Sequence, residues 1–346
     1  MLMVYGLEEN KQWDEIVRSF KAYDTYWLSG YVRAFYIHGD GEPQLFYYED
    51  EHTRGMNVVM KRDIADASCF RGCLPPNTYF DLATPYGYGG WLIEGEDTGA
   101  LQQAYTAYCC EHGIVSEFVR FHPMIENHVA VSDVYDVVAL GSTVAMDLAS
   151  PEEIWANMTS KNRNMVRKAQ KNGVTVLHTS QAWVYETFRE IYNGTMDKDH
   201  ADKYYYFSSA FYESVRCDLA ENAEMFYALY EGRVIAASIM LIANGRMNYH
   251  LSGSLREYAH LAPTNLLLYE AACWGGTQGC KTLYLGGGVG SGEDSLFKFK
   301  RSFYRGENLP RFYIGKRVFD EARYQVLTQM RKDLPQSNFF PQYRAK

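Results

Sequence analysis

Residues 261–288 read LAPTNLLLYEAACWGGTQGCKTLYLGGG and predict a helix followed directly by a strand. Proline fits the first turn of a helix because the backbone N–H that it lacks would be unpaired there, so we expect the helix to begin at Pro263. Gly279 suits the left-handed position that closes a helix. The segment KTLYLGG, which follows from Lys281, is then a strand that runs into a glycine-rich loop.

Further strands precede this helix in the second half of the chain. MFYALY, from Met225, and VIAASIMLI, from Val234, are predicted to form a hairpin across a Glu-Gly pair. Asn244-Gly245 is a strong signal for a type I′ turn, because both central positions of that turn need a positive φ. The turn leads into another strand, RMNYHLSGS.

The first half of the chain repeats this order. QLFYYE, from Gln44, and GMNVVMK, from Gly55, are predicted to form a hairpin, and YFDLA follows. A loop, PYGYGG, leads to a helix, TGALQQAYTAYCCEH, which Gly113 closes, and then to a strand, VSEFVRFH. Equivalent elements are about 170 to 180 residues apart, too far for a solenoid repeat. We therefore expect two copies of one α/β domain.

A new helix marks the boundary between the two copies. Ser150-Pro151-Glu152-Glu153 fits a capping box with proline at the first helical position. The preceding VVALGSTVAMDLA is predicted to be a long strand that bridges the halves. We therefore expect an N-terminal domain over residues 1–149 and a C-terminal domain over residues 150–346, with a further amphipathic helix over residues 181–198.

A basic segment, SKNRNMVRKAQKNGV, covers residues 160–174 of a chain whose formal net charge is -8. Ser160 suits the N-cap of a short helix. Arg163, Arg167 and Lys171 recur every four residues and should stand exposed on one helical face. Such concentrated positive charge suits a phosphate or a polyanion, and the plain alternative is a solvated basic face.

A second basic segment, FKFKRSFYRG, covers residues 297–306. Asp294 suits the N-cap of the helix that contains its first part. Phe299 and Phe303 are four residues apart and should anchor the buried, apolar face of that helix. The neighbouring cations would then form a phosphate or carboxylate clamp, or remain surface lysines.

Composition and spacing exclude several classes of protein. No apolar run reaches the roughly 18 to 20 residues that a membrane-spanning helix needs, and MLMVYGLEENKQWDE lacks the pattern of a signal peptide. Seven cysteines occur without metal-type spacing, so we expect reduced thiols, a cytoplasmic protein and no metal site. The absence of a G-x-S-x-G motif gives little support to nucleophilic catalysis.

Two loops have an unusual composition. Residues 285–292, LGGGVGSG, follow a strand but lack the GK[ST] ending of a phosphate-binding P-loop. They indicate a close approach of the backbone to another group, or mobility. Residues 84–90, TPYGYGG, place Tyr86 and Tyr88 where they would form a stacking wall for a sugar or a peptide, and a plain tight turn is the alternative.

In combination these segments resemble the FemAB-like family of the GNAT acyltransferase superfamily. The resemblance rests on SKNRNMVRKAQKNGV, PYGYGG, FVRFHPMIENH, residues 261–288 and FKFKRSF. It implies an α/β (α+β) fold of tandem GNAT-like domains, each with a mixed, mostly antiparallel sheet flanked by helices. It also implies that the C-terminal domain carries the basic helix and most of the active site.

The resemblance implies an N-acyltransferase. Fem-type enzymes transfer an aminoacyl group from aminoacyl-tRNA to an amine of a peptidoglycan precursor, whose diphosphate explains the basic residues. Lys300 occupies the lysine of the family's F-K-x-x-F pattern and would be the catalytic residue, by stabilising the negative charge that develops during acyl transfer. Substrate contacts are implied for Arg163, Arg167, Lys168, Tyr249, Tyr86 and Tyr88.

Two departures from the family pattern leave the acyl donor open. The coiled-coil tRNA arm of some members has no counterpart in this sequence. The GNAT loop that binds a pyrophosphate offers glycine amides, but residues 256–262 contain no glycine. The donor is therefore either aminoacyl-tRNA or acyl-CoA, and no tightly bound cofactor is expected.

The acceptor is expected to be a phosphate-bearing small molecule, a muropeptide or a cell-surface saccharide, and a peripheral contact with a membrane stays open. Two alternatives remain beside the Fem-type reading. One is an acyl-CoA-dependent GNAT N-acetyltransferase that acts on a small amine or sugar. The other is a non-catalytic binding module with the same fold.

Overall fold

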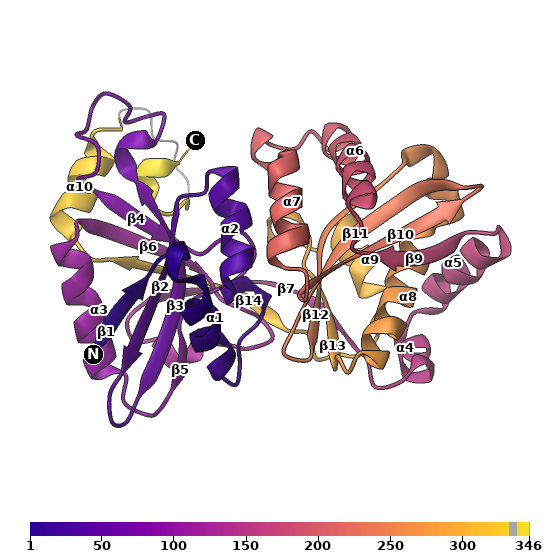
Figure 1. Ribbon diagram of the computed structural model, residues 1–346, viewed down its shortest axis with the longest axis horizontal. Coiled ribbons are helices and arrows are strands. Elements are labelled where there is room, and N and C mark those ends of the chain that lie inside the picture. Colours follow the sequence, from indigo (N-terminus) through magenta and orange to yellow (C-terminus); the bar gives the residue numbers. More distant parts are fainter. Residues whose placement is uncertain (332–337, 346) are drawn as a thin grey trace. The chain divides into compact units, whose positions relative to one another are not determined.

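The computed structural model describes residues 1–331 and 338–345, and the chain divides into two compact units (Figure 1). One unit comprises Met1–Leu140 and Phe312–Lys346, and the other comprises Gly141–Arg311. The sequence placed the boundary at residue 150 and assigned everything after it to the second domain. The structure differs because a strand near the C-terminus pairs with the first sheet, and no local pattern in the sequence announces such a long-range pairing.

The sheet of the first unit has the strand order β1-β2-β3-β4-β6-β14-β7, and β5 pairs with β3. β1 to β4 are joined antiparallel, β4 and β6 run parallel, and β14 is antiparallel to β6. The strands are β1 (Leu2–Tyr5), β2 (Glu42–Glu49), β3 (Arg54–Asp63), β4 (Phe80–Ala83), β5 (Leu92–Glu94), β6 (Ile114–Arg120), β7 (Asp136–Ser142) and β14 (Arg311–Val318).

Helices flank this sheet and cover an aromatic core. Phe46, Trp91, Tyr105 and Phe121 are buried together in that core. Burying large aromatic side chains contributes much of the hydrophobic stabilisation of a domain, so this cluster anchors the first unit. The helices are α1 (Asn10–Ser19), α2 (Ser29–His38), α3 (Gly99–Glu111) and α10 (Glu321–Gln329).

The sheet of the second unit has the strand order β8-β13-β12-β11-β10-β9. β9 to β12 are joined antiparallel, β12 and β13 run parallel, and β8 is antiparallel to β13. The strands are β8 (Val144–Asp147), β9 (Thr175–Thr179), β10 (Ala223–Tyr230), β11 (Arg233–Ala243), β12 (Arg246–Ser254) and β13 (Thr282–Gly286). The single long strand expected over residues 137–149 is instead split between β7 and β8, which belong to different sheets.

The helices of the second unit pack against its sheet and against one another. α6 contacts β11 and β12, α8 contacts β10, β11 and β13, and α5 packs on α8. Gly253 lets α6 approach β12 closely, because a Cβ atom at that position would lie only 2.9 Å from the Cα of Tyr192. The helices are α4 (Pro151–Asn157), α5 (Ser160–Lys171), α6 (Ala182–Lys198), α7 (Ser209–Asp218), α8 (Pro263–Thr277) and α9 (Ser295–Arg301).

The two units share one order of elements. In the first unit α1 and α2 separate β1 from an antiparallel run of strands, and in the second unit α6 and α7 separate β9 from such a run, after β8, α4 and α5. In each unit a crossover helix then leads to a parallel strand. α3 is the crossover helix of the first unit and α8 that of the second. The expectation of two α/β units, each with a mixed, mostly antiparallel sheet flanked by helices, is therefore confirmed.

Several helix and turn signals in the sequence act as predicted. Ser150 caps α4 by accepting a hydrogen bond from the backbone N–H of Glu153 at 3.2 Å, with proline at the first helical position. Asn244 and Gly245 both have positive φ angles, of 49° and 71°. The N-cap of α5 is Thr159 and not Ser160, since the Thr159 hydroxyl accepts from the backbone N–H of Asn162. Adjacent hydroxyl residues can exchange this role without changing the helix.

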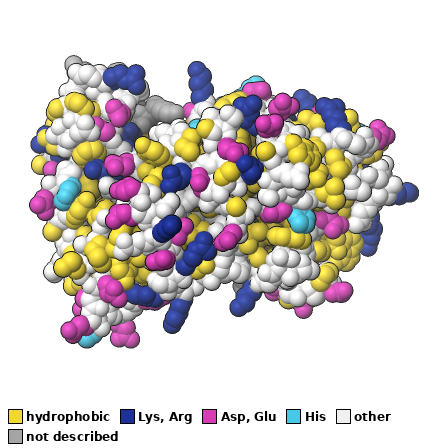
Figure 2. Space-filling model, in the orientation of Figure 1, with side chains coloured by type: hydrophobic (Ala, Val, Ile, Leu, Met, Phe, Trp, Pro, Cys, Tyr) yellow, Lys and Arg dark blue, Asp and Glu magenta, His cyan; other side chains and the backbone are white. Residues whose placement is uncertain are grey.

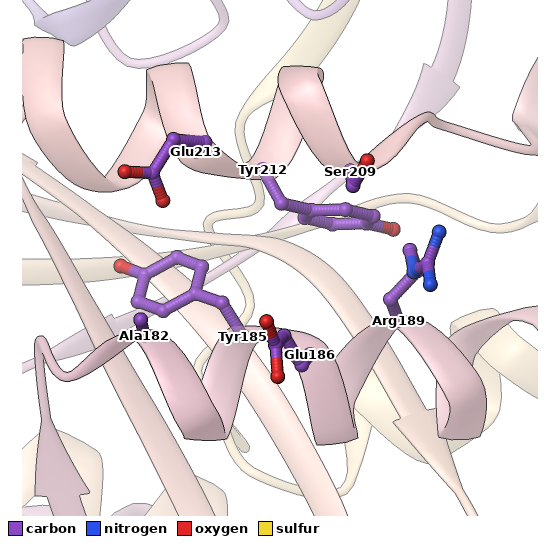
Figure 3. A pocket seen from close by; sticks show the side chains of 7 residues that line it. All are labelled: Ala182, Tyr185, Glu186, Arg189, Ser209, Tyr212 and Glu213. Atoms are coloured by element: carbon purple, nitrogen blue, oxygen red, sulfur yellow. The ribbon is translucent and has the colours of Figure 1, made fainter.

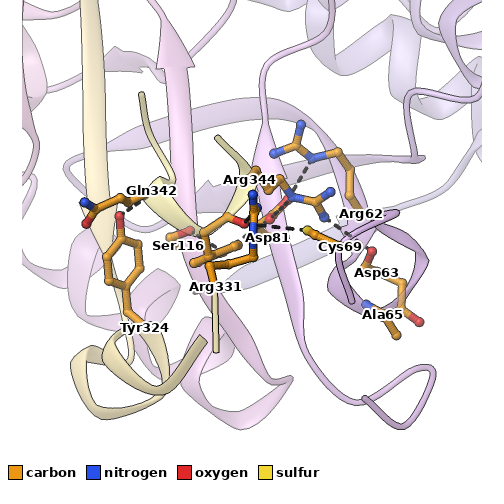
Figure 4. A network of polar contacts seen from close by, with 11 residues as sticks. Arg62, Asp63, Ala65, Cys69, Asp81, Ser116, Tyr324, Arg331, Gln342 and Arg344 are labelled. Atoms are coloured by element: carbon orange, nitrogen blue, oxygen red, sulfur yellow. Dashed lines mark hydrogen bonds and ion pairs between the residues drawn. The ribbon is translucent and has the colours of Figure 1, made fainter. Parts of the chain in front are cut away.

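A buried carboxylate in the first unit holds the C-terminal segment in place (Figure 4). Asp81 is fully buried and accepts hydrogen bonds from Arg62 at 2.7 Å, from the Tyr343 hydroxyl at 3.2 Å and from Arg344. The Tyr343 hydroxyl also lies 2.9 Å from the Ser116 hydroxyl. A buried charge is costly unless it is paired, and the C-terminal segment supplies two of the partners of Asp81. These contacts therefore tie the C-terminal segment to β4 and β6.

Candidate active site in the second unit

β12 and β13 diverge in the second unit. Their parallel pairing joins Arg246 to Thr282, Met247 to Leu283 and Asn248 to Tyr284. Within the described residues the pairing stops there, although β12 continues to Ser254 and β13 to Gly286. Two parallel strands that separate in this way expose backbone edges to each other, and an extended ligand with amide groups can pair with such an edge.

A β-bulge lies in β12 directly after the paired segment. Met240 of β11 pairs with Tyr249, whereas Ser238 pairs with Ser252, so an extra residue is inserted in β12. The Ser238 hydroxyl donates to the carbonyl oxygen of Leu251 at 2.9 Å, which holds the bulge in place. Bulges re-aim side chains and are common beside active sites. Here the bulge fixes the direction of the Tyr249 side chain.

Lys300 lies close to this part of the sheet. It belongs to α9, which begins after its N-cap Asp294, and only 9% of its surface is exposed. Its Nζ atom donates to the carbonyl oxygen of Gly287 at 2.8 Å and lies 5.9 Å from the centroid of the Tyr249 ring. Gly287 directly follows β13, so α9 brings the ammonium group to the end of β13 and beside β12.

The surroundings of Lys300 favour loss of its proton. Burial lowers the pKa of the Lys300 ammonium from 10.5 to about 8, and the opposing effect of the Asp294 carboxylate is smaller. Burial likewise raises the pKa of the Tyr249 phenol to about 12. At pH 7 Lys300 is therefore mostly charged and Tyr249 is protonated, so both groups act as hydrogen-bond donors.

The neighbours of Lys300 on α9 point elsewhere. Lys298 is exposed, and Arg301 donates to the carbonyl oxygen of Gly306 at 2.9 Å. Phe303 is fully buried, whereas Phe299 is half-buried, so the expectation that both phenylalanines lie in the core is correct only for Phe303. α9 ends at Arg301, so the two residues do not share a regular helical face.

Arg163 of α5 is engaged within the second unit. Its guanidinium donates to the carbonyl oxygen of Met158 at 2.6 Å and to that of Trp155 at 3.4 Å. These carbonyls lie at the C-terminal end of α4, where a cation complements the negative end of the helix dipole. Arg163 is therefore half-buried and caps α4, which corrects the expectation of an exposed cation.

Arg167 and Lys168 are exposed on α5. The Arg167 guanidinium lies 4.9 Å from the ring centroid of Trp155 and also donates to the Asn164 side chain at 3.2 Å. A further guanidinium, that of Arg305, donates to the carbonyl oxygen of Ala156 at 2.6 Å. Several cations thus gather around the C-terminal end of α4, and Arg167 and Lys168 remain accessible to solvent.

The surface charges elsewhere are mixed. On the face drawn in Figure 2, Lys and Arg side chains are interspersed with Asp and Glu side chains. With a formal net charge of -8, the chain would attract a polyanion only where cations gather locally. The cations around the end of α4 are such a place.

Tyr86 and Tyr88 belong to the first unit and are half-buried. Tyr86 stacks on Phe35, with the ring centroids 5.7 Å apart. The ring of Tyr88 makes edge-to-face contacts with Tyr26 and Phe312, with ring centroids 5.3 Å and 5.6 Å apart. Both tyrosines thus pack on aromatic neighbours within their own unit.

In the first unit, the loop after β4 continues to pair with β6, so the edge of β6 is not free. Its parallel strands β4 and β6 separate after Ala83, but the backbone N–H of Thr84 still donates to the carbonyl oxygen of Phe118 at 3.0 Å. Further along, the N–H of Gly89 donates to the carbonyl oxygen of Arg120 at 2.8 Å. The tyrosine-rich loop therefore occupies the edge of β6, so we assign the candidate site to the second unit.

Sequence reasoning missed two parts of this site. Gly287 accepts the hydrogen bond of Lys300 through its backbone, and a carbonyl acceptor leaves no signal in the residue type. The β12 bulge depends on a register shift, which only strand pairing reveals. The glycine run after β13 was a usable signal, because it indicated a close approach of the backbone to another group.

The described residues contain no cluster of three or more His, Cys, Asp or Glu side chains that would hold a metal ion. All seven cysteines are free thiols. None of the helices in the described ranges combines the length and hydropathy that a bilayer-spanning segment requires.

A known protein family matches most of the second unit. Residues 157–301 match the family model described as an acetyltransferase (GNAT) domain. The second unit carries a GNAT acyltransferase domain. The diverging strands, the bulge in β12 and Lys300 all lie inside the segment that matches this GNAT domain. No curated protein sequence matches the chain.

Solved structures show that the likeness extends beyond the GNAT domain. FemX matches with a TM-score of 0.66 at 13% identity, over 94% of this chain and 99% of FemX. The C-terminal domain of a putative lysylphosphatidylglycerol synthetase from Agrobacterium fabrum matches with a TM-score of 0.55 at 12% identity, over 93% and 94%. A tandem GNAT protein from the clavulanic acid biosynthesis pathway matches with a TM-score of 0.50 at 8% identity, over 92% and 99%. The chain therefore has a Fem-like tandem GNAT fold.

Proposed function

We propose that the protein is an N-acyltransferase of the Fem-like type, which transfers an acyl or aminoacyl group to an amine of a cell-wall precursor or a cell-surface saccharide. The GNAT domain and the Fem-like fold support an acyltransferase. The choice of acceptor follows from the likeness to FemX and from the cations on α5 and around α4. Both donors considered below occur in the cytoplasm, where the proposal places the reaction.

The observation that carries the proposal is the position of Lys300. A buried ammonium group whose pKa is about 8 lies at the end of β13 and beside Tyr249 on β12. Burying a charged group costs free energy, so a lysine in this position needs a compensating role. Perturbed ionisable groups of this kind concentrate at functional sites.

The reaction joins an amine to an activated acyl group. The uncharged amine attacks the carbonyl carbon of an ester or thioester, and the C=O electrons move onto oxygen to give a tetrahedral oxyanion. Collapse of this intermediate breaks the C–O or C–S bond and leaves the amide. A proton of the attacking amine passes to the leaving group, which departs as an alcohol or a thiol. Lys300 would donate a hydrogen bond to the oxyanion, since only one of its three N–H groups is used by Gly287.

The remaining candidate residues take supporting roles in this proposal. Tyr249 would contact the substrate beside Lys300, because the bulge directs its ring to that place. Arg167 and Lys168 would attract a phosphate-bearing acceptor, and Arg163 would mainly hold α4 in place for them. Tyr86 and Tyr88 would offer the exposed parts of their rings to a sugar or peptide.

The divergence of β12 and β13 favours a second candidate for the donor. An acyl-CoA carries an extended arm with two amide groups, and such an arm can pair with a free strand edge in the same way as a peptide. A GNAT N-acetyltransferase that uses acyl-CoA and a small amine or sugar is therefore the alternative. Aminoacyl-tRNA as donor would instead rely on the cations around the end of α4.

A direct transfer assay separates these candidates. The full chain would be incubated with labelled aminoacyl-tRNA or with acetyl-CoA, each together with UDP-linked muropeptide or glucosamine, and the amide would be detected by mass spectrometry. Transfer to the muropeptide or glucosamine is the expected result. If no donor yields an amide with any acceptor, the proposal is wrong. If a donor or an acceptor nevertheless raises Tm, the protein is a binding module.

A further inference from the structure

A pocket of about 190 Å³ lies between α6 and α7 of the second unit (Figure 3). Its walls belong to the helix pair and not to β12, β13 or α9, so it is separate in composition from the site around Lys300. The lining residues are Ala182, Tyr185, Glu186, Arg189, Ser209, Tyr212 and Glu213.

Two buried phenols in this pocket have no hydrogen-bond partner. The side chains of Tyr185 and Tyr212 are only 3% and 2% exposed, and neither hydroxyl is paired in the structure. Burial raises the pKa of both phenols, so each hydroxyl keeps its proton and remains a donor. A buried donor without a partner costs free energy, and a ligand that accepts a hydrogen bond would recover it.

One end of the pocket favours an anion. Figure 3 shows the Tyr212 hydroxyl at the end where Arg189 and Ser209 lie. Arg189 is half-buried, and within the described residues no carboxylate pairs with it. Ser209 begins α7, whose first turn adds the positive end of a helix dipole, and the Ser208 cap there is used by the N–H of Phe211.

The rest of the pocket favours a cation. Glu213 forms an ion pair with Arg216 at 2.5 Å, so its charge is already compensated. Glu186 is exposed, and among the described residues no cation pairs with it. Glu186 and Arg189 are three residues apart on α6, a spacing that brings the Cβ atoms to about 5–6 Å. A cation and an anion on one small molecule fit this separation.

We propose that this pocket binds a small free α-amino acid as its zwitterion. Arg189, Ser209 and the Tyr212 hydroxyl hold the carboxylate, and Glu186 holds the ammonium group. The Tyr185 ring borders the space for a short side chain. A phosphate dianion fits less well, because the carboxylate of Glu186 would repel its second charge. This binding needs only residues of α6 and α7, so it does not depend on the acyl transfer proposed above.

Isothermal titration of the full chain with glycine, L-alanine and L-serine tests the proposal. Propionate, ethylamine and inorganic phosphate serve as probes that carry only one of the two charges. At least one of the three amino acids should bind more tightly than every single-charge probe. Equal binding of propionate or phosphate would overturn the zwitterion, and no heat with any amino acid at saturating concentration would overturn the site.

Variants locate the binding. Arg189→Gln and Glu186→Gln should each weaken amino-acid binding about tenfold or more, since each removes a charge-assisted hydrogen bond. Glu190→Gln, on the same helix but outside the pocket, should leave the affinity unchanged. Equal losses in all three variants, or no loss in any, would show that the amino acid binds elsewhere.

The tyrosines provide a second readout. Tyr212→Phe removes a buried hydroxyl that has no partner, so the variant should have a higher Tm than the wild type without ligand while it binds the amino acid less tightly. A merely structural hydroxyl would not produce these opposite signs. A Tyr212→Phe variant with lower Tm and unchanged affinity would contradict the proposed contact.

Discussion

The Nζ atom of Lys300 lies 2.8 Å from the carbonyl oxygen of Gly287, which directly follows β13. This hydrogen bond orients a buried ammonium group. Of the other cations on α9, Lys298 is exposed and Arg301 donates to the carbonyl oxygen of Gly306. Burial and this hydrogen bond therefore distinguish Lys300 from the other cations of the same basic segment. Replacing these cations one at a time should have different effects on activity.

Replacing Lys300 by methionine should lower kcat by about 10²- to 10³-fold, the loss that removal of one oxyanion donor typically causes. Methionine keeps the length and apolar contacts of the side chain but removes the donor and the charge. Lys298→Met is the matched control, because Lys298 is exposed on the same helix and should retain nearly full activity. Similar losses in both variants, measured in the transfer assay, would leave only a general attraction of charge.

The pH dependence of kcat should show a descending limb near pH 8. Lys300 must be charged to stabilise an oxyanion, and its pKa is about 8. Raising the pH through that value removes the proton and the activity with it. Lys300→Met should lack this limb. An activity that instead rises through pH 8 in the wild type and not in the variant would show that Lys300 acts as a base.

The same pKa predicts how stability changes with pH. The lysine titrates near 10.5 in the unfolded chain and near 8 in the folded protein, so between these values the unfolded state binds more protons. Raising the pH from 8 to 10 should therefore stabilise the wild type relative to Lys300→Met, by up to about 3 kcal/mol. Urea titrations of both proteins at several pH values measure this difference, and parallel curves would contradict the lowered pKa.

Arg163 should matter for stability more than the other cations of α5. Arg163→Gln removes hydrogen bonds to the C-terminal carbonyls of α4 and should lower the free energy of unfolding by about 1–2 kcal/mol. Lys171→Gln, an exposed substitution on the same helix, should stay within about 0.5 kcal/mol. Equal stabilities of the two variants in chemical denaturation would mean that Arg163 does not cap α4.

Tyr343 should anchor the C-terminal segment. Its side chain is fully buried, and its hydroxyl contacts Asp81 and Ser116. Tyr343→Ala should lower the free energy of unfolding by about 3–5 kcal/mol, as other large aromatic truncations do. The neighbouring Gln342 is exposed, so Gln342→Ala is the control and should be close to neutral. A stable Tyr343→Ala protein would show that the C-terminal segment is dispensable for the fold.

Local sequence determined the secondary structure of this protein to a large extent. Ser150 with its following proline, Asn244-Gly245 and Asp294 each act within a few residues, through capping bonds and positive φ angles, so their effects are visible in the sequence. The repeated order of these elements was enough to predict two α/β units. The F-K-x-x-F pattern identified Lys300, because a family motif records a chemical role that spacing alone does not reveal.

Tertiary structure decided how these elements are shared and which cations are available. The pairing of β14 with β6 moves the C-terminal residues into the first unit, and it joins residues about 200 positions apart. Arg163 and Arg167 share the same residue type and one helical face, yet only the packing of α4 makes Arg163 a cap and leaves Arg167 exposed. The environment of Lys300 also depends on the fold, because desolvation lowers its pKa only after α9 has packed beside β13. Burial, strand register and long-range pairing arise from contacts between distant segments, which the linear order of residues does not encode locally.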